Sequence, residues 1–337
     1  MPLITRTRQL HLLNRPTGEP QESDFALATV PIPDLAHGEV LVRNTHVSVD
    51  PYMRGRMNDA PSYIAPFELN APLEGSAVGE VIKSRHDSVP VGAVVSHFAG
   101  LREHSVISGD EVTPIDVGVV PETAYLGPLG TTGLTAYAAV TRIAPVRKGD
   151  VVFVSGAAGA VGSIAGQLAR RLGASRVIGS AGGAAKVRAL REDFGYDDAI
   201  DYRTEGISER LAELAPDGVD VFIDNVGGDQ LEAGIDRMRQ HGRIAMVGAV
   251  SQYNLIERPT GPRNLYQAAT KELTLRGMLV TSHFDLMPEY LGTAIPWLAD
   301  GSLRSRETVV EGIESATAAL VGVLNGANLG KMLVRTA

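Results

Sequence analysis

The 337-residue chain contains no cysteine. Disulfide bonds, thiolate metal sites and cysteine nucleophiles are therefore excluded, and a reducing compartment is expected. Residues 1–16 lack the apolar run of a signal peptide, and no segment approaches the roughly 20 apolar residues that a membrane helix requires. An excess of positive charge is also missing, because the formal net charge is −8, which argues against broad binding to nucleic acid. These absences predict a cytoplasmic protein that has neither a membrane nor a nucleic acid as its partner.

The overall composition is that of an ordinary globular protein, with 44% hydrophobic and 21% charged residues. A chain of this length exceeds what one hydrophobic core usually organises, so two domains are expected. The 37 glycines and 19 prolines indicate many turns, and the chain contains no internal repeat.

The first third of the chain is a succession of short extended segments separated by proline and glycine. The alternation of polar and apolar residues is clearest at 39–47, where it predicts a strand with one exposed and one buried face. The expected strands are 25–30, 39–49, 77–84, 93–98 and 104–107. We therefore predict a mostly antiparallel β domain over residues 1–124.

The pattern changes near Ala124, beyond which apolar strands alternate with helices. The expected strands are 151–155, 176–180, 199–201, 219–225, 242–247 and 273–280, and the expected helices are 134–141, 160–172, 185–194, 208–215 and 229–239. This alternation implies right-handed βαβ crossovers and a doubly wound parallel sheet, hence an α/β fold, over residues 125–292. A last segment, 293–337, contains one expected helix at 313–325 and one strand at 331–335.

A glycine-rich turn lies between the strand at 151–155 and the helix that begins at Ala160. Its pattern is Ala157-x-Gly159-x-x-Gly162, which differs from G-x-G-x-x-G only at the first position. Gly159 lets the backbone approach a pyrophosphate, Gly162 permits close packing of helix on strand, and the helix N-terminus offers N–H groups to the anion. In this context the turn predicts a dinucleotide site.

The segment after the turn lacks the acid that NAD-binding domains place about 20 residues further on. No Asp or Glu occurs from Ala157 through Arg191, and the second strand ends at Ser180 with Lys186 close behind. A carboxylate would repel the 2′-phosphate of the adenosine, whereas small residues and a cation accommodate it. NADPH is therefore the expected cofactor.

Two further loops follow strands at the edge of the sheet where such folds bind ligands. They are Asp224-Asn225-Val226-Gly227-Gly228 and the segment from Gly248 to Asn254. Small residues there permit close approach of the backbone to a ring.

Several short motifs occur in a fixed order along nearly the whole chain. They are DPYMR at 50–54, GLTAY at 133–137, AAGAVGS at 157–163, DNVGG at 224–228 and NLGK at 328–331. With them the chain resembles the medium-chain dehydrogenase/reductase superfamily, and within it the zinc-independent leukotriene dehydrogenase/prostaglandin reductase and alkenal double-bond reductase group. DPYMR and DNVGG are the most specific of these motifs.

The resemblance implies a GroES-like first domain, a Rossmann domain and a C-terminal segment that returns to the first domain. It implies that Lys186 and Tyr202 hold the adenosine phosphate end, with Arg203 as a second cation. It also implies contacts from Asn225 and Tyr253 to the central and nicotinamide portions. The full set of predicted cofactor contacts is Ala157, Gly159, Ala160, Val161, Gly162, Ser180, Lys186, Tyr202, Asn225, Gly248, Tyr253 and Asn328.

The same resemblance implies reduction of the carbon–carbon double bond of enones or enals without a metal. Zinc-dependent relatives use cysteine and histidine ligands, which this chain cannot supply, and His46 is interpreted as a strand histidine rather than a ligand. The reaction needs hydride at the β-carbon, stabilisation of the developing oxyanion, and a proton for the α-carbon.

Tyrosine hydroxyls are the candidate proton donors. Tyr52, in DPYMR, is the first candidate for contact with the substrate, and Tyr63 lies in a proline-rich loop that resembles a pocket rim. Plant double-bond reductases often place a tyrosine where this chain has Thr270. Tyr266, one helical turn earlier, is the second catalytic candidate. Arg54 is expected to have a structural pairing role.

Two other functions remain open at this stage. The related quinone reductases share the A-x-G-x-x-G form, although DPYMR argues against that branch, and a non-catalytic NADPH-binding protein is the third alternative. A homodimer is also expected, because Rossmann domains of this superfamily often pair edge strands, for which 273–280 is the candidate.

Overall fold

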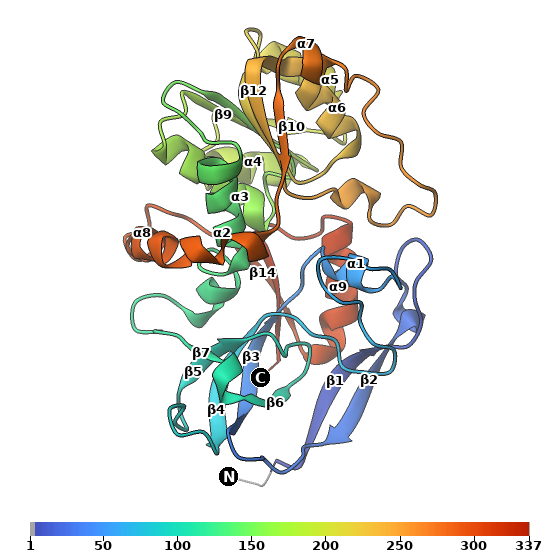
Figure 1. Cartoon of the computed structure of the whole chain (residues 1–337), viewed down its shortest axis with the longest axis vertical. Coiled ribbons are helices and arrows are strands. Elements are labelled where there is room, and N and C mark those ends of the chain that lie inside the picture. The colour runs from blue at the N-terminus through green and yellow to red at the C-terminus, as the bar shows by residue number, and fades with distance from the viewer. Residues whose placement is uncertain (1–3, 337) are drawn as a thin grey trace. The chain divides into compact units, whose positions relative to one another are not determined.

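The structure is a computed structural model that describes residues 4–336. The chain forms two compact units, Met1–Leu126 together with Glu307–Ala337, and Gly127–Arg306. In Figure 1 the first unit therefore combines the blue and turquoise start of the chain with its red end. No helix among the described residues is long and apolar enough to span a membrane.

The first unit is built mainly from antiparallel strands. Its sheet has the order β14-β15-β3-β4-β5-β7, with β6 also paired to β3, and β1 and β2 form a separate pair. Only β14 and β15 run parallel. The strands are β1 (Arg6–Leu12), β2 (Phe25–Pro31), β3 (Glu39–Ser48), β4 (Ala77–Ser84), β5 (Val94–His97), β6 (His104–Ser108), β7 (Thr113–Pro114), β14 (Glu307–Glu311) and β15 (Lys331–Arg335), and the helices are α1 (Met53–Arg56) and α9 (Ala316–Leu324).

Helix α9 brings the end of the chain onto the core of the first unit. Its residues Ala316, Ala319 and Leu320 share one buried cluster with Met53 and Met57 at α1, and the two helices lie side by side in Figure 1. Burial of these apolar side chains provides the main stabilisation at this junction. The unit is therefore completed by the last segment of the sequence.

Strand β3 lies inside its sheet, with β4 along one edge and β6 and β15 along the other. Asn44 and His46, which share the face of Val40 and Val42, are buried. The Asn44 amide donates to the carbonyl of Arg102 at 2.7 Å and to the hydroxyl of Ser105 at 3.0 Å. The polar groups on the buried face are thus satisfied by protein groups. The predicted exposed face is only partly exposed, because Glu39, Arg43 and Thr45 are half-buried and Leu41 and Val47 are buried.

The second unit contains a parallel sheet of order β10-β9-β8-β11-β12-β13 with helices on both faces. This order is the classic doubly wound arrangement, and the predicted α/β fold with a second, mostly antiparallel β unit is confirmed. The strands are β8 (Val151–Val154), β9 (Arg176–Ala181), β10 (Asp198–Asp201), β11 (Val219–Asp224), β12 (Met238–Met246) and β13 (Thr274–Gly277). The helices are α2 (Thr131–Ala138), α3 (Ala160–Arg171), α4 (Ala184–Glu192), α5 (Ile207–Leu214), α6 (Gly228–Arg237), α7 (Gln267–Thr270) and α8 (Met287–Ala299).

Helix α8 and the end of β13 differ from the predicted elements. Helix α8 was not expected because it contains two prolines, but Pro288 occupies the first turn, where its missing N–H costs nothing. Tyr290 of α8 is fully buried and donates to the carbonyl of Pro128 at 2.6 Å, so α8 belongs to the second unit. Strand β13 stops at Gly277, and the chain then turns into a 3₁₀ segment, Val280–Leu286.

Candidate functional site

The glycine turn joins β8 to α3 at the carboxyl end of the parallel sheet. Gly156 has a φ of +59°, and the N–H of Ala157 donates to the carbonyl of Ser180 on β9 at 2.8 Å. Gly159 is the extended N-cap of α3, and no side chain caps this helix. The N-terminus of a 12-residue helix therefore presents its N–H groups without a side-chain partner, as a pyrophosphate site requires.

Gly162 explains why the first turn of α3 can lie so close to the sheet. A Cβ atom at this position would stand 2.6 Å from the Cα of Ala157 and 2.6 Å from the carbonyl oxygen of Gly156. The buried Tyr196 hydroxyl donates to the Gly162 carbonyl at 2.6 Å. Only glycine fits this contact without backbone movement, which is the role that the motif predicted.

The expected adenosine end lies where β9 and β10 finish. A Cβ atom on Gly182 would approach the Tyr202 hydroxyl and the Arg203 guanidinium to 2.8 Å, so these two side chains lie over the turn after β9. Burial and the neighbouring Arg203 charge lower the pKa of Lys186. Two cations and a tyrosine hydroxyl thus gather at the place where a 2′-phosphate is expected.

Asp201 is an acidic residue near this end that the sequence reasoning did not consider. Its carboxylate accepts from the N–H of Gly183 at 2.8 Å and from the N–H of Arg203 at 3.1 Å. These bonds hold the turn after β9 to the loop after β10.

Ser180, a predicted cofactor contact, is fully buried. Its hydroxyl donates to the side-chain carbonyl of Gln230.

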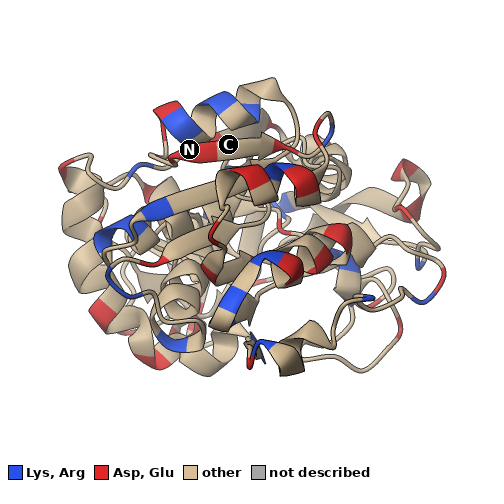
Figure 2. Ribbon diagram, turned by 90° about the horizontal axis from the view of Figure 1, so that it is seen from above, with Lys and Arg blue, Asp and Glu red and all other residues tan. Residues whose placement is uncertain are grey.

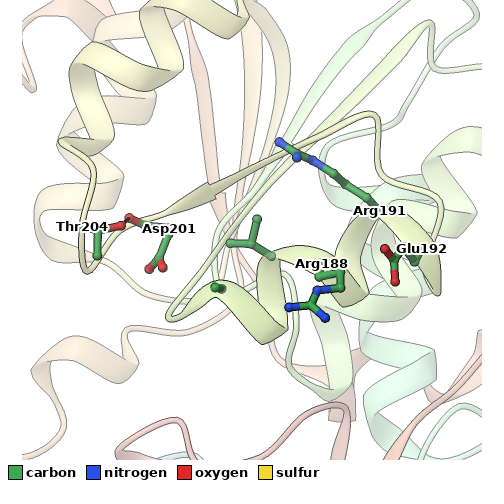
Figure 3. Close-up of a pocket in the computed structure, with 7 residues that line it drawn as sticks. Arg188, Arg191, Glu192, Asp201 and Thr204 are labelled. Carbon is green, nitrogen blue, oxygen red and sulfur yellow. Dashed lines mark hydrogen bonds between the residues drawn. The ribbon is translucent and has the colours of Figure 1, made fainter.

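A hollow of about 470 Å³ adjoins the adenosine end. Figure 3 shows Asp201 and Thr204 on one side of it and Arg188, Arg191 and Glu192 of α4 on the other. None of the predicted cofactor contacts lines this hollow. It is lined by Ala184, Val187, Arg188, Arg191, Glu192, Asp201 and Thr204.

The expected nicotinamide end is organised by the buried carboxylate of Asp224. It accepts from the Ser155 hydroxyl at 2.7 Å and from the N–H of Gly227 at 3.1 Å, although burial raises its pKa. Gly227 and Gly228 follow with φ values of +72° and +54°. The DNVGG segment is therefore a tight turn whose glycines are needed for their left-handed backbone.

Asn225, Gly248 and Tyr253 come together beside this turn. The Asn225 amide donates to the Ser155 carbonyl at 2.8 Å. The Tyr253 hydroxyl accepts from the N–H of Ala249 at 3.3 Å, and a Cβ atom on Gly248 would lie 3.3 Å from that hydroxyl. The structure thus brings together residues of two predicted loops, Asn225 of the first and Gly248 and Tyr253 of the second.

In the first unit, DPYMR forms the turn that leads into α1. Tyr52 is its N-cap residue with helical backbone angles, and its hydroxyl is buried with no hydrogen-bond partner among the described residues. Burial, followed by the charge of Asp50, raises the pKa of Tyr52. Its hydroxyl therefore remains protonated and is a hydrogen-bond donor.

A buried ion pair holds this turn to the C-terminal strand. The Lys331 ammonium on β15 donates to the Asp50 carboxylate at 2.9 Å and to the Val49 carbonyl at 3.0 Å. Lys331 is 3% and Asp50 8% exposed, and the Ser48 hydroxyl also donates to Asp50. Both residues belong to motifs identified in the sequence, but their pairing was missed. The available signal was a lysine directly before the apolar run Met332–Val334, because a lysine buried with such a strand requires a partner.

The remaining predicted residues occupy several environments. Arg54 is buried and donates to the backbone carbonyls of Pro16 and Gly18 and to Asn58, so its partners are neutral groups. The side chains of Tyr63 and Tyr266 are 55% and 79% exposed. Tyr266 precedes α7, at whose end Thr270 lies exposed. Asn328 is buried and donates to the Gly330 carbonyl at 2.6 Å.

The His46 side chain lies between the acidic residue Glu122 and the basic residue Arg335, both in the first unit. Its Nδ1 atom is 3.1 Å from the Glu122 carboxylate, and Arg335 donates to its Nε2 atom at 3.3 Å. Among residues 4–336 no group of three or more His, Asp or Glu side chains is arranged to hold a metal ion.

Figure 2 shows acidic and basic residues interspersed along the ribbons.

Comparisons with known proteins agree with this arrangement. Residues 8–115 match the family model described as the N-terminal domain of oxidoreductase, and residues 160–300 match the model described as zinc-binding dehydrogenase. The chain is 40% identical over 334 residues to the NADP⁺-dependent 2-alkenal reductase of Nicotiana tabacum, covering 97% of this chain and 96% of that protein.

Two further relatives match over nearly their full lengths. Prostaglandin reductase 1 of Bos taurus is 37% identical over 324 residues, covering 94% of this chain and 95% of that protein. The crystal structure of CurA in complex with NADPH from Vibrio vulnificus has a TM-score of 0.93 at 35% identity, covering 98% of this chain and 99% of that chain. The chain therefore belongs to the medium-chain dehydrogenase/reductase superfamily, in its zinc-independent group of prostaglandin reductases and alkenal double-bond reductases.

Proposed function

We propose that this protein uses NADPH to reduce the carbon–carbon double bond of α,β-unsaturated ketones and aldehydes. The observation that carries the reaction is the likeness to a 2-alkenal reductase along 97% of the chain. Hydride is added to the β-carbon and a proton to the α-carbon, which yields the saturated carbonyl compound. The protein is an NADP-dependent oxidoreductase of this kind.

The cofactor end of the proposal rests on the second unit. The pyrophosphate binds at the N-terminus of α3, which no side chain caps, and contacts Gly159, Ala160 and Val161. Gly162 allows the first turn of α3 to pack closely against the glycine turn. Lys186, Arg203 and Tyr202 bind the adenosine 2′-phosphate. Asn225, Gly248 and Tyr253 support the nicotinamide portion, and Asn328 is the proposed contact from the first unit. The complete proposed set also includes Ala157 and Ser180.

Bound NADPH supplies the hydride, and the side chains of the protein position the substrate and manage its charge. Tyr52 is the proposed donor to the substrate, since its buried hydroxyl lacks a protein partner. Tyr63 is the proposed rim residue. Tyr266 stays the second catalytic candidate, although its 79% exposure favours Tyr52 for a reaction that needs a water-excluded donor.

The proposed cofactor domain comprises residues 125–292, and the proposed substrate domain comprises residues 1–124. Of the last segment, 293–337, the part from Glu307 onward belongs to the same unit as the substrate domain. We also propose a homodimer that works in the cytoplasm. Strand β13 supports the dimer, because it is the edge strand of its sheet and residues Thr274, Arg276 and Gly277 are exposed. Light scattering after size exclusion tests the dimer, and a monomeric mass would contradict it.

The test of the reaction is a turnover screen with NADPH and NADH in parallel. Small enals, aryl enones and prostanoid-like enones are compared with a benzoquinone, and saturated products are identified by mass. We expect enone reduction with NADPH preferred. Faster turnover of the quinone would favour a quinone reductase, and NADPH binding without any turnover would favour a non-catalytic binding protein.

A further inference from the structure

Two unpaired polar atoms lie on one face of the short helix α1. They are the Tyr52 hydroxyl and the Nη1 group of Arg56, both buried without a hydrogen-bond partner among the described residues. Four positions separate the two residues, and Tyr52 already has helical φ and ψ angles. This spacing brings side chains together on a helix. No other two residues with such atoms in the described chain lie within four positions of each other.

The other two nitrogens of Arg56 have partners. Its Nε donates to the Ala65 carbonyl at 2.8 Å, its Nη2 donates to Glu74 at 2.8 Å, and its guanidinium lies 4.1 Å above the Phe67 ring. The side chain is only 4% exposed. These contacts fix the guanidinium in place and leave the N–H groups of Nη1 available as donors.

Leaving a charged group partly unpaired in a buried place is costly, so such atoms call for a partner. Both free groups are donors, because Arg56 has no acceptor and the Tyr52 hydroxyl stays protonated. Two donors four positions apart on one helix suit a single acceptor oxygen placed between them. Glu74 balances the charge of Arg56 before the reaction. The acceptor best suited to these donors is therefore an oxygen that is neutral in the bound substrate and becomes negative during the reaction.

We propose that Arg56 is a catalytic residue that binds the carbonyl oxygen of the enone together with Tyr52. This inference rests on the proposed function. As hydride adds to the β-carbon, the π electrons shift and negative charge develops on the carbonyl oxygen. The Arg56 N–H and the Tyr52 hydroxyl donate hydrogen bonds to that oxygen and keep their protons, and a proton taken from water at the α-carbon then restores the carbonyl. Oxidised cofactor and the saturated ketone or aldehyde are the products.

The first test compares Arg56→Met with Glu74→Gln, using the smallest cyclic enone that the wild-type enzyme reduces. Glu74→Gln removes the ion pair but leaves the free Nη1 group, so it is the matched control. We expect Arg56→Met to lower kcat about 100-fold with little change in KM, as for loss of one oxyanion donor. The control should stay within about threefold of wild type. Equal losses in both variants, or a kcat that Arg56→Met leaves unchanged, would overturn the proposal.

A second test measures ligand binding instead of turnover. It uses the more conservative variant Arg56→Lys, in case Arg56→Met folds poorly. Para-nitrophenol imitates the enolate, and its ionised form has a distinct absorbance. With NADP⁺ present, the wild-type enzyme should bind the phenolate, and Arg56→Lys should weaken this binding about 10-fold. Binding of the neutral phenol with equal affinity by both proteins would reject the oxyanion site. If no enone is reduced at all while the phenolate still binds through Arg56, the proposed function fails instead.

Discussion

Backbone groups form most of the proposed cofactor site in the second unit, whereas side chains form the proposed substrate site in the first. The N-terminus of α3, the close packing of Gly162 and the left-handed glycines after Asp224 shape the proposed cofactor site. Around Tyr52, a buried lysine and carboxylate hold the turn, and two donors have no partner among the described residues. Backbone conformation therefore determines the first site, and buried polar side chains determine the second.

This difference determines which changes each site tolerates. A site made by backbone tolerates most side-chain changes but not a Cβ atom at its glycines. A site made by buried polar side chains is sensitive to any change that leaves a charge unpaired. The following predictions test this contrast, beginning with the largest expected effect.

Substitution Lys331→Met should have the largest effect on stability. It leaves the Asp50 carboxylate buried without its cation, and breaking a buried pair in this way typically costs about 3–5 kcal/mol. Urea unfolding measures the loss. The double variant Asp50→Asn/Lys331→Met removes both charges and should recover most of it. If the single variant loses less than about 1 kcal/mol, the ion pair does not hold the Tyr52 turn.

Substitution Gly162→Ala should damage the cofactor side without any change of charge. The added Cβ atom meets the backbone of Gly156 and Ala157, which cannot yield as a flexible side chain does. We expect a cost of about 3 kcal/mol, seen as weaker NADPH binding in calorimetry and a lower Tm. Gly292→Ala in α8, where a Cβ atom meets nothing within 4 Å, is the control and should be neutral or stabilising. Unchanged NADPH affinity in Gly162→Ala would contradict the close-packing role.

Acid should destabilise the first unit through His97. Burial lowers the pKa of His97 to about 4, from an ordinary value of 6.5. The unfolded chain therefore takes up this proton first, and stability falls as the pH drops from 6.5 towards 4, by on the order of 3 kcal/mol. Urea midpoints measured across this range should fall less steeply for His97→Gln. Parallel curves for the two proteins would assign the acid sensitivity to other groups.

Substitution Lys186→Ala should have the smallest effect. Loss of one of two cations at the adenosine end should weaken NADPH binding about 10-fold and leave NADH binding unchanged. Competition titrations with both cofactors measure this ratio, and Arg188→Ala, on the neighbouring hollow, is the control. An equal loss for both cofactors would show that Lys186 does not recognise the 2′-phosphate.

The features predictable from sequence were those that depend on local conformation. The parallel sheet and the glycine turn follow from apolar strands, glycine positions and βα alternation, each visible in short segments of the sequence. The edge position of β13 was expected only from the family resemblance. The motif positions of Asn225 and Gly248 likewise indicated one end of the sheet, and the structure brings them together with Tyr253.

Features that depend on distant pairing could not be predicted in this way. Lys331 and Asp50 are 281 positions apart, and neither reveals its partner by spacing. The burial of Asn44 and His46 on β3 depends on neighbours from β15, β4 and β6, and the unpaired Nη1 group of Arg56 depends on where Ala65 and Glu74 place the rest of its guanidinium. In each case an isolated segment has the same pattern whether its polar groups face water or protein.

The two-part construction of the first unit also has a consequence for synthesis. Strands β14 and β15 and helix α9 come from Glu307–Arg335, so the sheet of the first unit lacks these elements until that segment has been synthesised. The second unit, Gly127–Arg306, is continuous in sequence, and all its strands are synthesised earlier. On the ribosome, the second unit should therefore fold before the first, although the first unit begins to emerge earlier.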